Sequence, residues 1–259
     1  MVNYMNTMHF WRAVGVIALG ASLFAPSFAF AAELDSDTDG LLDSWETRVF
    51  QTSPTVADTD GDGFSDGTEV RYGFDPNNAK SGARLKEADF DRDGLSDAKE
   101  VAFGSDPTKS DTDGDSYADG TEVDNAFTPT DPAPKPLVKS ILIDLSEQRI
   151  YQKLDGVTVG THVVSSGKKS TPTPVGTYKI QTKSVKAWSR SAKLWMPYWM
   201  GFRGWTYGIH ELPEWPGGKK EGKNHLGIPV SHGCVRVDEG VAKALYEWSP
   251  IGTPVTIQR

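Results

Sequence analysis

Cysteine is nearly absent from this chain: its 259 residues include one, Cys234. A single thiol excludes an intramolecular disulfide, so covalent cross-linking cannot hold the fold together. Long apolar runs are equally scarce. The run over residues 13–24 is shorter than the ~20 residues that a membrane-spanning helix needs. No other segment is long enough to cross a membrane, so we predict no transmembrane segment once a leader is removed.

The apolar run has the features of a leader. Arg12 precedes it, and Ala29-Phe30-Ala31 offers a small-x-small cleavage site, which together are typical of a secretory signal peptide. We predict a signal peptide over residues 1–31, with a membrane anchor as the alternative. From the signal peptide we predict that the chain is exported to the periplasm, the cell wall or the extracellular space. In such oxidising surroundings Cys234 is a buried inert residue, an intermolecular cross-link or a reactive thiol.

Positive charge is scarce in the first half of the mature chain. Residues 33–135 carry 26 Asp and Glu against 9 Lys and Arg, whereas residues 136–259 carry 9 against 17. Such asymmetry indicates two modules with different roles. The positive half suits an anionic wall polymer, and we predict no nucleic-acid partner.

The acidic half contains four twelve-residue segments of one pattern, starting at residues 35, 58, 89 and 111. Asp occupies positions 1, 3, 5 and 9 and Glu occupies position 12, as in D-x-D-x-D-G calcium loops. Carboxylates on alternate residues of a tight loop can converge on one hard cation. Ser116 replaces the glycine of position 6 in the fourth loop, so we expect a weaker or distorted site there. The predicted ligands are Asp35, Asp37, Asp39, Asp43, Glu46, Asp58, Asp60, Asp62, Asp66, Glu69, Asp89, Asp91, Asp93, Asp97, Glu100, Asp111, Asp113, Asp115, Asp119 and Glu122.

Helices are expected only after these loops, because prolines precede the second and fourth. A calcium loop with a following helix and no incoming helix resembles the thrombospondin type 3 repeat. The resemblance covers about residues 33–125 and implies structural Ca²⁺; a solvated acidic linker is the alternative. Residues 126–136 contain four prolines, so we predict a stiff, extended linker and a domain boundary there.

The basic half, residues 137–259, has mainly β patterning. Apolar and polar residues alternate on both sides of Asp155-Gly156, which predicts a hairpin. Residues 237–249 predict one clear helix with Asp238 as its N-cap. Five tryptophans lie within residues 186–215, where core packing is the favoured role and a substrate-facing wall the alternative. The predicted fold is a mainly β domain with one clear helix, preceded by a repeat module with short helices.

The neighbours of the thiol suit nucleophilic chemistry. A cysteine attacks only as thiolate, so it needs a base or a positive environment. On a strand His232 would share a face with Cys234, and His210 lies further upstream. The amides of Gly233 and Cys234 are candidate donors to an oxyanion, and Arg236 could bind a carboxylate. A buried, inert cysteine is the alternative.

The sequence "SHGCVR", preceded by "YGIH", resembles the signature of the L,D-transpeptidase catalytic domain (the YkuD-type family). The resemblance spans about residues 137–259 and implies cross-linking of peptidoglycan by two-step acyl transfer through a cysteine thioester, with no catalytic cofactor. It implies Cys234 as nucleophile and His210 as general base. The residues that would shape the site are Ser231, His232, Gly233 and Arg236.

One departure from the family is the 20 residues between His210 and Ser231, which we interpret as a surface insertion beside the site. His225 within it is expected to be solvated. Three alternatives to transpeptidation remain. The same thiol could serve an L,D-carboxypeptidase or the attachment of a protein to the wall. The domain could also be an inactive part of a calcium-dependent wall-binding or adhesion protein, with other wall components as partners.

Overall fold

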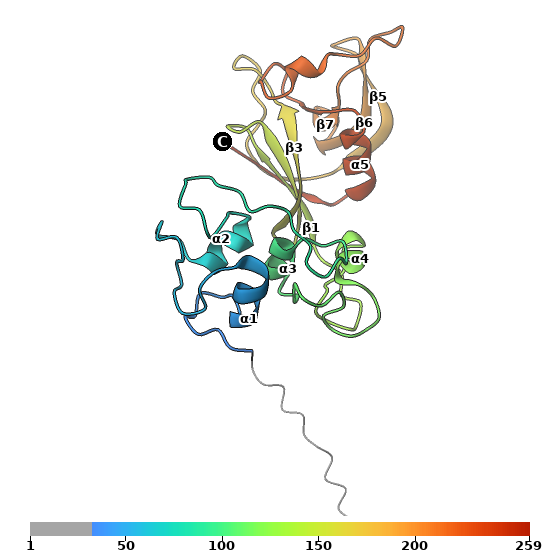
Figure 1. Cartoon of the computed structure of the whole chain (residues 1–259). Coiled ribbons are helices and arrows are strands. Elements are labelled where there is room, and N and C mark those ends of the chain that lie inside the picture. The colour runs from blue at the N-terminus through green and yellow to red at the C-terminus, as the bar shows by residue number, and fades with distance from the viewer. Residues whose placement is uncertain (1–32) are drawn as a thin grey trace, which may run out of the picture. The chain divides into compact units, whose positions relative to one another are not determined.

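The computed structural model describes residues 33–259, so the predicted signal peptide lies outside the described residues. Short helices come first in the chain and strands afterwards (Figure 1). Within residues 33–259 none of the helices has the length and apolar character of a membrane span. The helical elements are α1 Asp43–Trp45, the π-helical turn η1 Glu46–Phe50, α2 Asp66–Tyr72, α3 Asp97–Phe103, α4 Asp119–Asp124, the 3-10 turn η2 Lys223–His225 and α5 Val241–Trp248. The strands are β1 Lys139–Asp144, β2 Arg149–Leu154, β3 Val157–Ser165, β4 Gly176–Lys179, β5 Thr182–Ser189, β6 Leu194–Arg203, β7 Tyr207–Glu211, β8 Val235–Val237 and β9 Pro254–Gln258.

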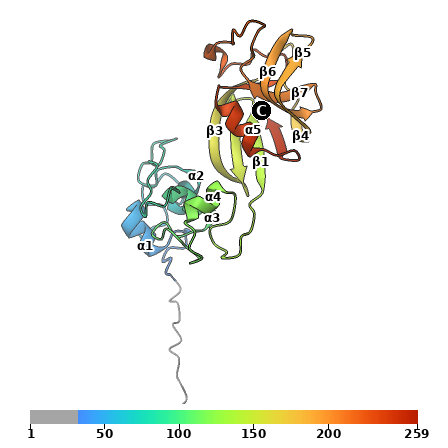
Figure 2. The ribbon, with the colours of Figure 1, turned by 90° about the vertical axis from the view of Figure 1, so that its right-hand side faces the viewer.

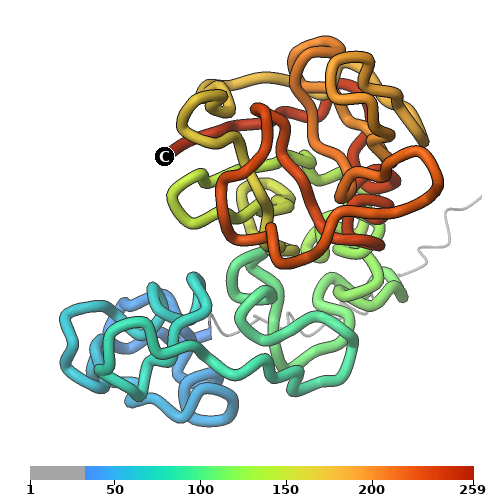
Figure 3. Tube along the Cα trace, turned by 90° about the horizontal axis from the view of Figure 1, so that it is seen from above, coloured from blue at the N-terminus to red at the C-terminus, as the bar shows by residue number. Residues whose placement is uncertain are grey.

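Each acidic loop is followed by a helix that starts at its ninth position, as the sequence predicts. Helices α2 and α3 end at glycines with left-handed backbone, the usual way to stop a helix. Figure 3 follows this part of the chain, from blue to green, as a succession of tight turns. A small core of Leu41, Phe50, Val70 and Val101 joins the first three repeats.

All nine strands of the described chain belong to one sheet, in the order β4-β9-β1-β2-β3-β8-β7-β6-β5. The pairs β1–β9 and β7–β8 are parallel, and the other neighbouring pairs are antiparallel. Asp155 and Gly156 form the β2–β3 turn with φ of 44° and 90°, as the hairpin signal predicts. Helix α5 packs on β6 and β7 (Figure 2). The prediction of a mainly β domain with one clear helix is confirmed.

The predicted start of that helix is wrong. Helix α5 begins at Val241, after Gly240 with φ 78°. The Asp238 carboxylate instead bonds to the Lys223 ammonium and to the Glu239 N–H. Because Gly240 occupies the position before α5, Asp238 is not the N-cap.

The proline-rich segment also differs from its prediction, because it folds back on itself instead of extending. Phe127 pairs with Pro136 in an antiparallel bridge. The Leu137 N–H donates to the Ala126 carbonyl over 2.8 Å. Proline fixes its own φ but does not prevent a turn, and here backbone hydrogen bonds close the loop.

The closed loop brings a second small core together. Leu137 packs in one cluster with Leu95 and Val123 of the repeats and with Leu154 of β2. Trp248 of α5 lies against the same cluster. Residues on both sides of the predicted boundary therefore share buried apolar surface.

Candidate functional site

The loop that carries Cys234 is braced from within by Ser231. The buried Ser231 hydroxyl donates to the Cys234 carbonyl over 2.5 Å and accepts from the Gly233 N–H over 3.0 Å. The Ser231 carbonyl accepts hydrogen bonds from the Lys168 N–H and the Thr171 hydroxyl. Ser231 thus fixes the turn that places Cys234 directly before β8.

Glycine is required at position 233. Its φ is 110°, and a Cβ there would lie 2.5 Å from the Tyr207 ring. Since the Gly233 N–H already bonds to Ser231, we correct its predicted role: this amide is engaged within the loop and does not face an oxyanion. The amide of Cys234 stays a predicted oxyanion donor.

His232 does not share a face with Cys234. The strand begins only at Val235, and the left-handed Gly233 between the two residues breaks the alternation on which that prediction rests. His232 is exposed, whereas Cys234 is half-buried. Within the described chain, no hydrogen bond joins them.

His210 and Arg236 lie side by side. Strands β7 and β8 run parallel, with His210 opposite Arg236, and Cys234 lies two residues before Arg236. Cys234 lies one residue before β8, and the charge of Arg236 lowers the pKa of both the Cys234 thiol and the His210 ring, so Arg236 lies close to both groups. Among the described residues, no hydrogen bond links Cys234 to His210.

The His210 ring is fixed by its surroundings. Its Nδ1 lies 2.6 Å from the Glu211 carbonyl oxygen, and it stacks on Trp199 at 6.0 Å between ring centroids. A carbonyl oxygen can only accept, so Nδ1 carries the hydrogen and Nε2 keeps the lone pair. Burial lowers the pKa of His210 to about 4, and the charge of Arg236 acts in the same direction. The ring is therefore neutral at physiological pH and able to accept a proton at Nε2.

The surroundings of Cys234 shift the pKa of its thiol in opposite directions. Burial raises the pKa of the thiol, while a hydrogen bond from the Gly208 backbone and the charge of Arg236 lower it. The net shift is upward. The thiol therefore depends on a base for activation.

The segment between His210 and Ser231 is attached to the site by ion pairs. Lys220 lies 2.9 Å from the Glu211 carboxylate, and Lys223 lies 2.9 Å from Asp238. Arg236 lies 2.9 Å from the Glu221 carboxylate. The carboxylate predicted for Arg236 thus comes from the chain itself. Glu211 orients His210 through its backbone carbonyl and not through its side chain.

His225 of the same segment is not simply solvated. Its Nδ1 lies 3.0 Å from Glu221, and its side chain is 39% exposed. It therefore lies at the edge of the Arg236–Glu221 pair.

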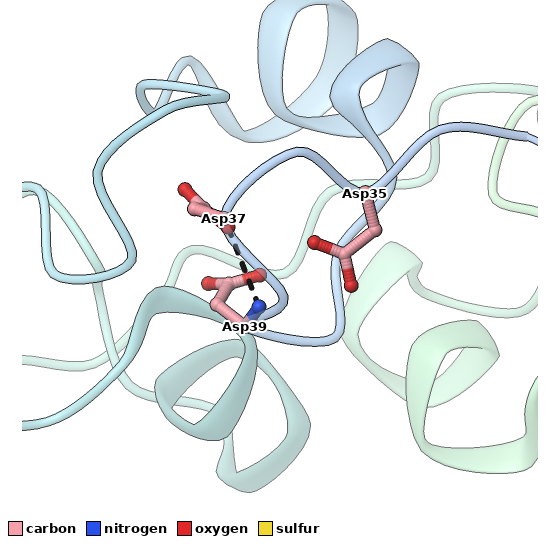
Figure 4. Close-up of side chains that lie close together, drawn as sticks. All are labelled: Asp35, Asp37 and Asp39. Atoms are coloured by element: carbon pink, nitrogen blue, oxygen red, sulfur yellow. Dashed lines mark hydrogen bonds between the residues drawn. The ribbon is translucent and has the colours of Figure 1, made fainter.

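Each acidic loop gathers three carboxylates. The Asp residues at positions 1, 3 and 5 of all four loops place oxygens within 4.8 Å of one another. Figure 4 shows the first loop, where the Asp39 N–H donates to Asp37 within the same turn as Asp35. Clustered like charges cost free energy unless a cation balances them.

Buried oxygens without a partner recur at the same two positions in every loop. The Asp at position 3 and the Glu at position 12 each have at least one buried oxygen that makes no hydrogen bond: Asp37, Asp60, Asp91, Asp113, Glu46, Glu69, Glu100 and Glu122. Burial raises the pKa of Glu100 to about 9 and that of Glu69 to about 7, and neighbouring Asp residues add to both shifts. An all-oxygen donor set of this kind fits Ca²⁺.

The Asp residues at position 9 have another role. In the second loop, Asp66 accepts from the Thr59 N–H and hydroxyl, one bond to each carboxylate oxygen. Asp119 does the same with Thr112, and Asp43 with Ser36. Asp97 accepts from the Phe90 N–H. These four carboxylates thus help to close the loops, and their role as ligands stays a prediction.

The fourth loop is not distorted. Ser116 adopts φ 81°, and its N–H donates to Asp111 over 2.9 Å. The glycine of the second loop makes the matching bond to Asp58, also over 2.9 Å. The substitution by serine therefore leaves the loop geometry intact and places backbone strain at one residue.

The two family models that match this chain cover different parts of it. The model of the L,D-transpeptidase catalytic domain matches residues 138–257. The match covers slightly less than half of the chain and includes His210, Cys234 and Arg236. The model of the bacterial TSP3 repeat matches residues 58–79 and 89–110, which include the second and third acidic loops. The two resemblances expected from the sequence are therefore confirmed.

Individual relatives are more distant. The putative L,D-transpeptidase YciB of Bacillus subtilis (strain 168) is 30% identical over 122 residues, which cover 44% of this chain and 63% of that protein. An L,D-transpeptidase structure from Mycobacterium smegmatis has 19% identity and a TM-score of 0.43, covering 49% of this chain and 61% of the other. One from Stackebrandtia nassauensis has 29% identity and a TM-score of 0.40, covering 46% and 55%. The chain thus spans less than two thirds of the length of each of these relatives.

The candidate site contains residues that sequence reasoning missed. Tyr207 lies against Gly233, and Trp199 stacks on His210. Glu221 binds Arg236. For Glu221 the available signal was one acidic residue among Lys219, Lys220 and Lys223, in a segment interpreted as a surface insertion.

Proposed function

We propose that residues 137–259 act as an exported L,D-transpeptidase on peptidoglycan stem peptides, with Cys234 as nucleophile. The observation that supports this most directly is the register of β7 and β8. His210 lies opposite Arg236, which is two residues from Cys234, and all three residues lie within the segment that matches the family model.

The proposed first step forms a thioester. His210 Nε2 takes the thiol proton, and the Cys234 sulfur attacks the carbonyl of the L-centred third residue of a stem tetrapeptide. The bond to the terminal D-alanine breaks, and its amine leaves with the proton held by His210. In the second step an amine of an acceptor stem attacks the thioester and gives up a proton to His210. An amide forms, the C–S bond breaks, and the proton passes to the released sulfur, which restores the thiol.

Product analysis tests this proposal. Purified protein is incubated with tetrapeptide muropeptides, and the products are identified by mass spectrometry. A cross-linked dimer with release of D-alanine is expected, and Cys234→Ala should abolish it. Unchanged product in that variant would sink the mechanism. A tripeptide product without a dimer would indicate a carboxypeptidase, and a protein-linked product would indicate attachment of protein to the wall.

One observation favours a second candidate, a wall-binding protein with an inactive domain. The pKa of Cys234 is raised by burial, and the described structure has no hydrogen bond between Cys234 and His210. An inert cysteine reacts slowly at neutral pH. Titration with a small electrophile therefore separates the two candidates, since an active nucleophile should react faster than free cysteine and an inert one more slowly.

We also propose that the acidic loops bind Ca²⁺ as a structural ion. The support is the recurrence of buried, unpartnered oxygens at positions 3 and 12. The cation would balance the clustered carboxylates, with Asp at positions 1, 3 and 5 and Glu at position 12 as ligands. Isothermal calorimetry with CaCl₂ should show up to four sites, and Asp91→Ala should remove one.

A further inference from the structure

The segment between His210 and Ser231 contains Glu221, whose carboxylate balances the charge of Arg236. Glu221 accepts from Arg236 Nη1 over 3.0 Å at one oxygen, and the other oxygen lies 2.9 Å away. The two side chains are 9% and 11% exposed. Because both charges are buried, removing one partner leaves the other without compensation.

The segment itself is held in place independently of this pair. The Glu221 N–H donates to the Pro213 carbonyl. Lys220 bridges Glu211 and Glu239 at 2.9 and 3.0 Å. Glu221 therefore reaches Arg236 from a fixed backbone, which allows its carboxylate to determine where the guanidinium lies.

We propose that Glu221 is a positioning residue of the active site, which holds the Arg236 guanidinium beside His210 and Cys234. Arg236 is opposite His210 in the β7–β8 register and two residues from Cys234. Its positive charge stabilises a thiolate at Cys234. The segment is thereby part of the site and not a surface addition.

The inference rests on the proposed function only in treating Cys234 as the nucleophile, and its test reads the thiol directly. The elements around the Cys234 loop carry several titratable or charged groups. They are Arg236 on β8, His210 and Tyr207 on β7, His232 in the loop before Cys234, Lys168 in the loop that bonds to Ser231, and Glu221 with His225 in the segment.

The experiment measures the rate of alkylation of Cys234 by iodoacetamide against pH in the full mature chain. Cys234 is the one thiol of the sequence, so the signal belongs to one residue. In Glu221→Ala the guanidinium loses its acceptor and moves away from the thiol. The midpoint of the pH dependence of alkylation, which reports the pKa of the thiol, should rise by about one pH unit. Glu221→Gln keeps an acceptor oxygen and removes a negative charge, so its midpoint should equal or fall below that of the wild type.

The two variants separate positioning from charge. If Glu221 acted only through its charge, both midpoints would fall, and if it were only structural, neither would move; either result overturns the proposal. Glu214→Ala is the matched control, because Glu214 lies in the same segment but pairs with Lys186 at 2.9 Å. A shift in that control as large as in Glu221→Ala also overturns the proposal.

Folding and function are controlled separately. If Glu221→Ala does not fold by circular dichroism, Glu221→Gln decides, since a midpoint above that of the wild type contradicts the proposal. Alkylation needs no muropeptide substrate. A chain that shows the expected shifts without forming cross-linked product would support the role of Glu221 and contradict the proposed function.

Discussion

The Ser231 hydroxyl bonds to the backbone of both Gly233 and Cys234, so it fixes the position of Cys234. Ser231→Ala removes two buried hydrogen bonds. We expect a loss of about 1–3 kcal/mol in the free energy of unfolding, measured with urea, and a lower alkylation rate of the thiol. Thr253→Val is the control: it removes one buried hydroxyl bonded to Pro250, and should reduce stability without changing thiol reactivity. Equal reactivity in the two variants would contradict the bracing role.

His210 makes stability depend on pH. Its pKa is lowered by burial from 6.5 to about 4, so the unfolded chain binds a proton in this window and the folded chain does not. The free energy of unfolding should therefore fall as pH drops from 6.5 to 4, by up to about 3 kcal/mol from this residue. His210→Gln should remove that part of the slope in urea titrations. A slope identical to that of the wild type would show that His210 is already charged in the folded state.

Sequence reasoning identified the residues that chemistry constrains most. Cys234 and His210 were found from a signature, and in the structure His210 lies opposite Arg236, two residues from Cys234. Glu221 and the hydrogen bonds of the position-9 carboxylates were missed for a physical reason. A carboxylate can bind a cation, a backbone N–H or a guanidinium, and only the folded loop decides which partner is within reach.

At the scale of elements, the acidic loops are arranged in two pairs. Asp39 of the first loop accepts from the Gly67 N–H of α2 over 2.8 Å, and Asp93 of the third accepts from the Gly120 N–H of α4 over 2.6 Å. A Cβ on Gly120 would lie 2.7 Å from the Asp93 carbonyl oxygen. The glycine of the Asp-Gly-Thr-Glu sequence in the second and fourth loops thus permits close contact with the first and third loops.

The pairing predicts the effect of Gly120→Ala. Overpacking at this contact should cost about 1–3 kcal/mol and reduce the rise in melting temperature produced by Ca²⁺. Thr121→Ala, at the neighbouring exposed position of α4, is the control. Equal calcium responses in the two variants would show that the third and fourth loops bind their ions independently.

The elements also show where sequence patterns are insufficient. The hairpin at Asp155-Gly156 and the helices after the loops depend on local sequence, and they were predicted. The proline-rich segment was predicted to be extended because proline content reports stiffness. Its closure depends on Leu137 packing against Leu95 and Leu154, which are distant in sequence.

At the scale of the whole molecule, the cluster of Leu95, Val123, Leu137 and Leu154 links the repeats to the sheet. With Ca²⁺ bound, we expect residues 34–259 to unfold in one calorimetric transition, and chelation to divide it in two. Leu154→Ala should divide the transition even with Ca²⁺ present, at a cost of about 2–5 kcal/mol. A single transition in that variant would show that this cluster does not couple the two parts. Val185→Ala, at an exposed position of β5, is the control.

The strand order has a consequence for how the molecule is made. Strand β9, Pro254–Gln258, lies between β4 and β1, although those strands precede it by at least 75 residues in the chain (254 − 179). Until residues 254–258 arrive, β1 and β4 have unpaired edges and the sheet is incomplete. A growing chain can fold its acidic repeats early, but residues 137–259 cannot complete their sheet until translation has passed β9. Under the proposed export, this order of assembly would delay folding of the sheet until after transport.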